Sequence, residues 1–300
     1  MMWPLDCVRN TELLANHTSF RIGGPAEWFA EPSTIEELQR LLQEAFHLGI
    51  PVSVMGGGTN LLVADHGIRG LTLHLGRGFR GVDVLSSADA PHATVRCGSG
   101  VLTQRLVSLA GQHGWGELEA LAGLPGQVGG AVVMNAQAIG RFVDHVTLVT
   151  LEGVVKQLRQ EELHFTYRYT ALEPSVVVGV VFHFPKVAPE MASARIQEAL
   201  RYRNTTQDLQ LPSAGCAFKN PSGMSAGRLI DQAGLKGSRI GDARISVRHA
   251  NFIVNLGQAT CDDVLSLMEH VQRRVARTFG VWLEPEVRLL GEWGPRPTAE

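Results

Sequence analysis

Apolar and polar positions follow a helical period first and a strand-like run directly afterwards. Between residues 33 and 49 apolar side chains recur every three or four positions: Ile35, Leu38, Leu41, Leu42 and Ala45. Ser33 and Glu36 form a candidate capping box at the start of this helix, and Gly49 predicts its end. The short β-branched run 50–55 then predicts a buried strand. A helix, a strand and a glycine loop in this order indicate the start of an α/β unit.

The rest of the chain predicts helices and strands in mixed order. We expect strands in these ranges: two within 81–98 around a polar turn, and one each in 143–153, 175–184 and 251–255. We expect helices over 101–114, 190–204 and 259–280, the last capped by Thr260 and Asp263. The pattern predicts an α+β protein with a linker over residues 185–189 and a domain boundary near residue 187.

Composition and charge exclude several functional classes. The 300 residues suggest two domains, and a net charge of −2 offers no concentrated basic face for nucleic acid or an anionic membrane. The N-terminus has no secretory-signal pattern, and no apolar run approaches the ~20 residues that span a bilayer. The four cysteines are scattered, and the 11 histidines form no HxxxH or HExxH pattern. We therefore expect a reduced, cytoplasmic protein without a disulfide framework and without a metal.

Two glycine-rich segments are candidate ligand loops. MGGGTNLLV (55–63) follows the strand 50–55, and successive glycines can present consecutive backbone N–H groups to phosphate oxygens. It is neither a Walker loop nor a GxGxxG loop, so a tight surface turn explains it equally well. LAGLPGQVGGAVVMNAQA (121–138) is apolar and nearly uncharged, which suits a bulky diphosphate ligand or close packing of a helix on a strand. Two such loops modestly favour a dinucleotide.

Two further segments place a charged residue among apolar or aromatic neighbours. In FTYRYT (165–170), strand alternation sends Arg168 to one face and both tyrosines to the other, where its guanidinium can grip a carboxylate. A solvent-exposed arginine on a strand is the commoner case. In WLEPEVRLLG (282–291), Glu286 lies in a short apolar, strand-like run, where an unpaired carboxylate is costly. Surface exposure is the simpler explanation there.

One cysteine lies in an unusual setting. In LPSAGCAFKNP (211–221), Cys216 follows a glycine and precedes Lys219 and Asn220. It could be a nucleophile, a metal ligand, a proton donor or a small buried apolar residue, and the last is the usual role of a lone cysteine. The flanking glycine and the nearby polar groups favour a ligand site instead.

The order of these motifs, rather than any one of them, carries a family resemblance. The motifs are NHTSFRIGGPAEWF (16–29), GGGTNLLV (56–63), GLPGQVGGAVVMNA (123–136), YR (167–168), PSAGCAFKNP (212–221), AGLKGSRIGDARIS with HANFIVN (233–255) and LEPEVR (283–288). Together they resemble the UDP-N-acetylenolpyruvoylglucosamine reductase family in its shorter form, a family of flavoenzymes of peptidoglycan precursor synthesis. The resemblance spans residues 16 to 291.

The resemblance implies a fold and a site. The implied fold is α+β: an FAD-binding region of two subdomains over 1–187, split near 71–80 and of the vanillyl-alcohol-oxidase-like type, then a substrate-binding domain over 188–300 whose extreme C-terminus packs back on the first subdomain. The implied contacts to non-covalent FAD are Arg21, Gly56, Gly57, Gly58, Thr59, Asn60, Leu61, Gly123, Leu124, Pro125, Gly126, Val128, Gly129, Gly130, Asn135 and Ala136. The implied substrate contacts are Tyr167, Lys219 and Asn220.

The resemblance also implies a reaction. NADPH reduces the flavin, which then reduces UDP-N-acetylglucosamine enolpyruvate to UDP-N-acetylmuramate. Arg168 stabilises the charge that accumulates next to the substrate carboxylate, and Glu286 acts as a neutral acid or orients its neighbours. Cys216 delivers the final proton, in a position where the family usually has serine. A thiolate cannot donate a proton, so we expect the Cys216 thiol to be mostly protonated at the working pH. A second departure is NTTQDLQLPSAG (204–215), where a more basic lead-in is usual.

Two alternatives remain beside a monomeric reductase. A flavin oxidase of related fold would act on a small alcohol or hydroxy acid, but no histidine or cysteine stands clearly placed for covalent flavin attachment. A non-catalytic FAD or nucleotide-binding protein would require Arg168, Cys216 and Glu286 to be incidental.

Overall fold

The computed structural model describes residues 3, 5–87, 89–172 and 174–292, which divide into two units. The first unit comprises the described residues of Met1–Arg9, Phe29–Gly57 and Leu71–Arg203. The second comprises those of Asn10–Trp28, Gly58–Gly70 and Asn204–Glu300. The domain limits implied by the resemblance stay predictions, and residues 293–300, the extreme C-terminus, lie outside the described residues.

The first unit contains a five-stranded sheet in the order β6-β7-β10-β8-β9. Its strands are β6 (Val82–Val84), β7 (His92–Gly98), β10 (Ser175–Pro185), β8 (Val143–Thr150) and β9 (Val155–Arg159), and every neighbouring pair is antiparallel. The long central strand β10 places Val181 opposite Arg96 on one side and opposite His145 on the other. The predicted runs over 81–98, 143–153 and 175–184 thus form β6, β7, β8 and β10, whereas β9 was not predicted.

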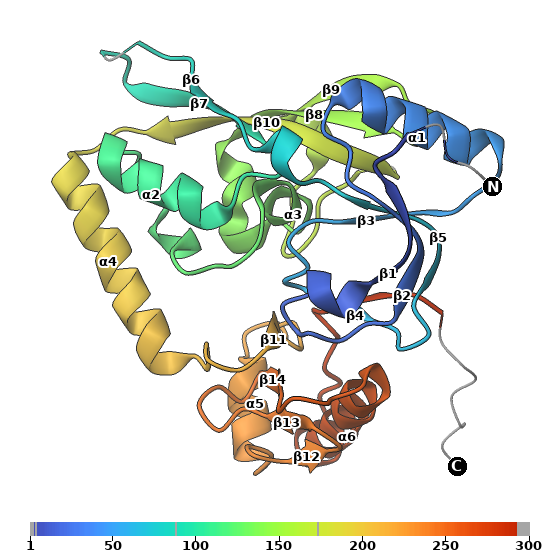
Figure 1. Ribbon diagram of the computed structural model, residues 1–300. Helices are drawn as coiled ribbons and strands as arrows, with labels where there is room; N and C mark the ends of the chain where they lie inside the picture. Colours follow the sequence, from blue (N-terminus) through green and yellow to red (C-terminus); the bar gives the residue numbers. More distant parts are fainter. Residues whose placement is uncertain (1–2, 4, 88, 173, 293–300) are drawn as a thin grey trace. The chain divides into compact units, whose positions relative to one another are not determined.

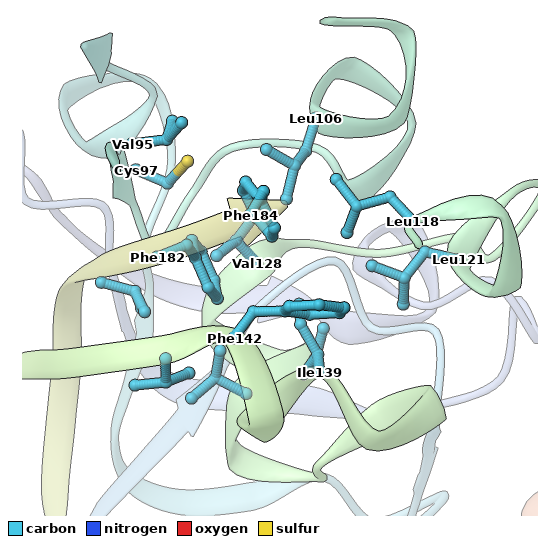
Figure 2. Packing of buried hydrophobic residues seen from close by; sticks show 14 of the residues in the cluster. Val95, Cys97, Leu106, Leu118, Leu121, Val128, Ile139, Phe142, Phe182 and Phe184 are labelled. Atoms are coloured by element: carbon cyan, nitrogen blue, oxygen red, sulfur yellow. The ribbon is translucent and has the colours of Figure 1, made fainter. Parts of the chain in front are cut away.

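One face of this sheet carries the core of the first unit (Figure 2). Phe182 and Phe184 alternate with the exposed His183 along β10, as the period of a strand requires. Helices α2 (Thr103–His113) and α3 (Val128–Val133) pack on that face through Leu106 and Val128. Figure 1 shows both helices on the same side of β10. The glycine-rich segment that contains α3 is therefore built directly onto a packed core.

The first predicted helix and strand form with two corrections. Helix α1 (Ile35–His47) is capped by Thr34, whose hydroxyl accepts the Glu37 N–H at 3.1 Å, so the predicted Ser33–Glu36 box is wrong by one position. Strand β3 (Val52–Met55) is not fully buried, since Val54 is 39% exposed. It lies at the edge of the sheet β1-β2-β5-β3, which also contains β1 (Val8–Leu13), β2 (Pro25–Ala30) and β5 (Ile68–His74).

The second unit contains a four-stranded sheet in the order β11-β14-β13-β12. Its strands are β11 (Ser213–Cys216), β14 (Phe252–Asn255), β13 (Ala243–Ile245) and β12 (Arg239–Ile240). Helices α5 (Ala226–Gln232) and α6 (Cys261–Phe279) share one apolar core with this sheet. The predicted cap of α6 is confirmed, because Thr260 and Asp263 form a reciprocal capping box. A short parallel pair, β4 (Leu61–Val63) with β15 (Arg288–Leu290), completes the unit.

The remaining elements connect these parts. Helix α4 (Pro189–Thr206) leads from β10 toward β11, as the pattern over 190–204 predicts. Short 3-10 turns occur at Leu14–His17, Arg77–Phe79, Glu119–Leu121, Ala136–Phe142 and Gln160–Leu163. In the described part of the chain, no helix has both the length and the apolar character that crossing a membrane requires.

Candidate active site

Cys216 ends a bulged strand. Strand β11 pairs Ser213 with Val254 and Cys216 with Phe252, so two residues of β11 lie opposite one residue of β14. Gly215, directly before Cys216, has φ +76°, a left-handed conformation that glycine adopts without strain. A bulge bends the strand and redirects the side chains next to it, and bulges are common beside active sites. The glycine thus serves the backbone conformation, and a Cβ added there would meet no atom within 4 Å.

The exposure of the cysteines separates their roles. Cys97 and Cys261 are 0% and 1% exposed and act as small core residues, whereas Cys216 is only partly buried. Cys216 also lines a small, largely apolar pocket, together with residues of the core: Phe20, Ala214, Gly215, Ala217, Ile253, Val264, Met268 and Val287. The partial exposure of Cys216 distinguishes it from the two core cysteines, and its role at a ligand site stays a prediction.

Cys216 and Glu286 lie on neighbouring chain segments. The Glu286 N–H donates to the carbonyl of Ala217 at 2.8 Å, and the Lys219 N–H donates to the carbonyl of Glu284 at 2.8 Å. Glu286 is partly buried and precedes β15, so its predicted place inside a strand is wrong by a few residues. Pro285 makes only an isolated bridge with Phe218. The structure therefore brings two of the three predicted catalytic residues onto adjacent segments.

The end of the first glycine loop joins the Glu286 segment. The Asn60 side chain donates to the Glu286 carbonyl at 3.2 Å, and the Arg288 N–H donates to the Asn60 carbonyl at 3.0 Å. Leu61 then pairs with Arg288 in the parallel β4–β15 ladder. Loop residues predicted to bind FAD thus share hydrogen bonds with the segment of a predicted catalytic residue.

The predicted substrate residues Lys219 and Asn220 follow Cys216 on the same segment. The Lys219 ammonium lies 3.3 Å from Oε2 of Glu284. Both side chains are solvent-exposed enough that such a pair contributes only about 0–1 kcal/mol, so an anionic ligand can displace Glu284. The side-chain Oδ1 of Asn220 accepts the Ala226 N–H at 3.0 Å and so caps the first turn of α5.

The segment around Arg21 is held against the sheet that carries Cys216. The Ser19 hydroxyl donates to the carbonyl of Ser213 at 2.7 Å, and Nδ2 of Asn255 donates to the carbonyl of Phe20 at 3.1 Å. The Ser19 N–H reaches the carbonyl of Gly58 at 3.1 Å. Arg21 itself is exposed and has φ +55°. The turn therefore presents the Arg21 side chain to solvent beside the glycine loop.

Packing accounts for some of the predicted cofactor glycines and not for others. A Cβ on Gly58 would lie 2.0 Å from the His17 carbonyl oxygen, and one on Gly129 would lie 2.7 Å from Cβ of Ser99. A Cβ on Gly130 would meet nothing within 4 Å, and one on Gly56 would meet only the Gln127 side chain. Close packing therefore explains Gly58 and Gly129 but not Gly130, whose role in ligand binding stays a prediction.

The remaining residues of 123–126 are tied to α2. The Gly123 N–H donates to Oε1 of Gln104 at 3.1 Å, and the Thr103 N–H donates to the Gly126 carbonyl at 3.0 Å. Gly123 and Gly126 both have positive φ, +73° and +111°. Leu124 is partly buried and Pro125 is exposed. This stretch is a fixed loop between the 3-10 turn Glu119–Leu121 and α3.

Arg168 lies in a tight turn, so the prediction of strand alternation around it is wrong. The Thr166 N–H donates to the Tyr169 carbonyl at 3.0 Å and the Tyr169 N–H donates to the Thr166 carbonyl at 3.3 Å, which leaves Tyr167 and Arg168 as the turn. Arg168 has φ +57°, and its guanidinium carbon lies 5.4 Å from the centre of the Tyr167 ring. Both tyrosines are more than half exposed, whereas Arg168 is partly buried.

Asn135 holds this turn to the end of α3. Its Nδ2 donates to the Thr166 carbonyl at 2.8 Å, and its Oδ1 accepts the Gly140 N–H at 3.0 Å. The Thr170 hydroxyl adds a bond of 2.8 Å to the Val132 carbonyl. Ala136 is 9% exposed and belongs to the core. The Asn135 amide, predicted to lie near the cofactor, is thus used to position the Arg168 turn.

Comparisons with known proteins establish the family of this chain. Residues 26–159 match the family model of an FAD binding domain, and residues 207–290 match that of the UDP-N-acetylenolpyruvoylglucosamine reductase C-terminal domain. The chain is 44% identical over 296 residues to UDP-N-acetylenolpyruvoylglucosamine reductase 2 of Symbiobacterium thermophilum, covering 97% of this chain and 93% of that protein. The chain belongs to the UDP-N-acetylenolpyruvoylglucosamine reductase family. This confirms the resemblance.

A solved member of this family has the same fold. The Thermus caldophilus reductase superposes with a TM-score of 0.78 at 39% identity, covering 94% of this chain and 99% of that one. A further relative, from Heliobacterium modesticaldum, is 41% identical over 290 residues, which are 94% of this chain and 90% of that protein. The predicted α+β fold with an FAD-binding region is confirmed, and this family member is a flavin-dependent oxidoreductase.

The residues present fit an FAD diphosphate. Among the described residues, the backbone N–H groups of the successive Gly57 and Gly58 have no protein acceptor. Consecutive N–H donors of this kind bind anionic oxygens. Gly130 opens onto free space, because a Cβ there would touch nothing within 4 Å. In the described residues, no cluster of three or more His, Cys, Asp or Glu side chains has a metal-binding arrangement.

Sequence reasoning missed residues that act through the backbone. Asn251, Asn255 and Gln127 lie inside the motifs quoted for the family resemblance, but period and spacing do not distinguish them. Each is an amide, at most 5% exposed, beside a segment of the candidate site. A polar residue inside an otherwise apolar run, as in NFIVN, is the signal that could have found two of them.

Proposed function

We propose that this protein reduces UDP-N-acetylglucosamine enolpyruvate to UDP-N-acetylmuramate with NADPH as co-substrate and FAD as cofactor. One observation carries the proposal: a bulged strand ends at a partly exposed Cys216, and the next residue is hydrogen-bonded to Glu286. A proton donor and a carboxyl group on adjacent segments suit the last step in reducing the carbon–carbon double bond of an enol ether. Membership of the reductase family supports this substrate class.

FAD would be held by the two glycine loops and the Arg21 turn. Gly57, Gly58 and Gly130 offer the N–H groups and the space that a diphosphate needs, and Thr59, Asn60 and Leu61 continue the first loop. Bound at these residues, FAD would supply hydride transfer from NADPH to the enolpyruvyl double bond. In this proposal the FAD-binding region occupies residues 1–187 in two subdomains of the vanillyl-alcohol-oxidase-like type, and the substrate-binding domain follows.

Arg168 and Tyr167 would bind the enolpyruvyl end of the substrate. The Arg168 guanidinium offers parallel N–H donors that match a carboxylate, and negative charge on that carboxylate grows as hydride reaches the neighbouring double bond. The turn geometry supports this role, because two backbone bonds and the Asn135 amide fix the arginine before substrate arrives. A preorganised cation loses little free energy to reorganisation during the reaction.

Cys216 would supply the proton, and Lys219 and Asn220 would bind the UDP-sugar. The Sγ–H bond breaks as its proton moves to the carbon that carries the carboxylate, and water reprotonates the thiolate afterwards. The proposal requires a neutral thiol before the transfer, because a thiolate has no proton to donate. Glu286 would hydrogen-bond as a neutral acid or orient the groups around it. The protein would act as a cytoplasmic monomer.

The test separates the two half-reactions. Purified protein reconstituted with FAD should absorb near roughly 450 nm, and anaerobic NADPH should bleach that band. The enolpyruvyl UDP-sugar should restore it, whereas small alcohols and hydroxy acids should not. Failure of the enolpyruvyl substrate to re-oxidise the bleached enzyme would rule out the reductase, and bleaching by NADH at an equal rate would rule out the NADPH preference.

Replacing Cys216 tests the assignment of the proton donor. Cys216→Ala should leave bleaching by NADPH unchanged and slow re-oxidation by substrate about 10²-fold or more, as loss of a general acid typically does. Cys216→Ser should recover much of the rate, because a hydroxyl donates a proton from the same place. Equal slowing of both half-reactions in Cys216→Ala would mean that this side chain is structural.

A further inference from the structure

A buried asparagine, Asn251, forms hydrogen bonds with the two residues that follow Cys216. Nδ2 of Asn251 donates to the Phe218 carbonyl at 2.8 Å, and its Oδ1 accepts the Phe218 N–H at 3.0 Å. The Asn251 carbonyl also accepts the Ala217 N–H at 2.8 Å. Asn251 is 3% exposed and Phe218 is 1% exposed, so water cannot replace these bonds. One residue thus makes three hydrogen bonds to the two residues directly after Cys216.

This arrangement gives the irregular segment the support of a strand. Beyond the bulge, the Ala217–Lys219 segment leaves the ladder between β11 and β14. The Asn251 side chain offers one donor and one acceptor to both polar groups of Phe218, as a neighbouring strand would. On the other side, the segment bonds to Glu284 and Glu286 through Lys219 N–H and Ala217 carbonyl. The segment is therefore fixed from both sides.

The fixed position matters for the chemistry on each side of the segment. Cys216 precedes it, Lys219 ends it, and Glu286 is bonded to its first residue. A displacement of about 1 Å between a catalytic group and a reacting atom can cost about 10²-fold in rate. We infer that Asn251 is a positioning residue for the reduction, which sets where Cys216 lies relative to Glu286. This inference rests on the proposed role of Cys216.

Only an amide meets both requirements at this position. Aspartate has nearly the same shape, but its carboxylate has no donor and would turn an oxygen toward the Phe218 carbonyl. Alanine supplies neither bond and leaves the buried Phe218 N–H and carbonyl unpaired. Asn251→Asp keeps the volume and one of the two side-chain bonds, and so separates hydrogen bonding from packing.

The experiment compares half-reactions in the FAD-loaded enzyme. In both Asn251→Ala and Asn251→Asp, bleaching by NADPH should stay within about twofold of wild type, whereas re-oxidation by saturating enolpyruvyl UDP-sugar should slow by about tenfold or more. The solvent deuterium isotope effect on re-oxidation should rise, because a misplaced thiol makes proton transfer slower. If Asn251→Ala does not fold, the nearly isosteric Asn251→Asp gives the same readouts.

A matched variant controls for general destabilisation. Thr260→Ala removes the capping box of α6 in the same unit, and Thr260 makes no bond to the Ala217–Lys219 segment. It should lower the melting temperature without slowing re-oxidation. Wild-type re-oxidation of both Asn251 variants, or equal slowing in Thr260→Ala, would overturn the positioning role. If wild-type enzyme itself is not re-oxidised by the substrate, the proposed function fails instead, so the two failures are distinguishable.

Discussion

A methyl group on Gly58 is the sharpest probe of the first glycine loop. Gly58 has φ +62°, and a Cβ built on it would lie 2.0 Å from the His17 carbonyl oxygen and 2.8 Å from Cα of Thr18. Both neighbours are backbone atoms, so no flexible side chain can move aside. Gly58→Ala must therefore displace the loop, the His17–Thr18 segment or both.

The chain offers a control that separates the two costs of this substitution. Gly49 has a nearly equal φ of +66°, but a Cβ there would meet no atom within 4 Å. Gly49→Ala should lower the free energy of unfolding only by the cost of a left-handed alanine, about 1–2 kcal/mol. Gly58→Ala should lower the free energy of unfolding by the same amount plus an overpacking cost of about 1–3 kcal/mol. The difference between the two variants isolates the close approach of the loop to His17.

Two measurements on the same pair of variants complete the test. Urea unfolding of FAD-free protein should give Gly58→Ala a loss of about 2–5 kcal/mol, against about 1–2 for Gly49→Ala. Titration with FAD, followed by quenching of flavin fluorescence, should show weaker binding only in Gly58→Ala, since displacing Gly58 moves two candidate phosphate donors. Equal stability losses would refute the packing argument, and unchanged FAD affinity in Gly58→Ala would refute the assignment of the loop to FAD.

Three further outcomes follow from the same structure. Arg168→Gly removes a left-handed arginine at φ +57°, so urea unfolding should show a gain of up to about 1–2 kcal/mol while re-oxidation by substrate slows. Burial raises the pKa of the Cys97 thiol to about 12. The stability that the neutral thiol contributes is therefore complete below the pKa of the unfolded chain and is lost as pH rises from there toward the pKa of the folded protein. Urea titrations above pH ~8.5 should then show a decline steeper than in Cys97→Ala by at most about 1.4 kcal/mol per pH unit. Asp65→Ala should lower the free energy of unfolding by about 1–2 kcal/mol, and with it the melting temperature. The reason is that the Asp65 carboxylate accepts the N–H groups of Cys261 and Asp262 at 2.9 and 3.2 Å.

Periodicity predicted the regular elements because burial imposes it. The helix over 259–280 forms as α6 with its predicted cap, and the β-branched run 175–184 forms the central strand β10. The errors occur where two local choices are nearly equal in free energy. Thr34 caps α1, whereas the sequence favoured its neighbour Ser33; either hydroxyl could accept an N–H of the first turn. Apolar content alone does not tell an edge strand such as β3 from a central one.

The candidate site was harder to predict, because its residues do not lie on regular elements. Arg168 is in a two-residue turn at φ +57°, and Cys216 follows a bulge at Gly215. Neither a two-residue turn nor a bulge produces a repeating pattern of apolar and polar residues. The strand alternation expected around Tyr167–Tyr169 was therefore wrong. The family resemblance proposes these positions because it compares whole motifs, including residues that only position a neighbour.

Two such positioning residues, Asn135 and Asn251, explain how a site can use irregular backbone and still be rigid. A bulge or a left-handed turn leaves polar groups without ladder partners, and each such group costs free energy when buried. After the Cys216 bulge, the Asn251 amide pairs both polar groups of the buried Phe218. At the Arg168 turn, the Asn135 amide adds a second bond to the Thr166 carbonyl, which already accepts the Tyr169 N–H. Because an amide has both a donor and an acceptor on a short stem, it can replace a strand edge where no strand fits. The two groups that the proposed reaction needs, a carboxylate-binding arginine and a proton donor, are therefore each fixed by an asparagine that never needs to touch the substrate.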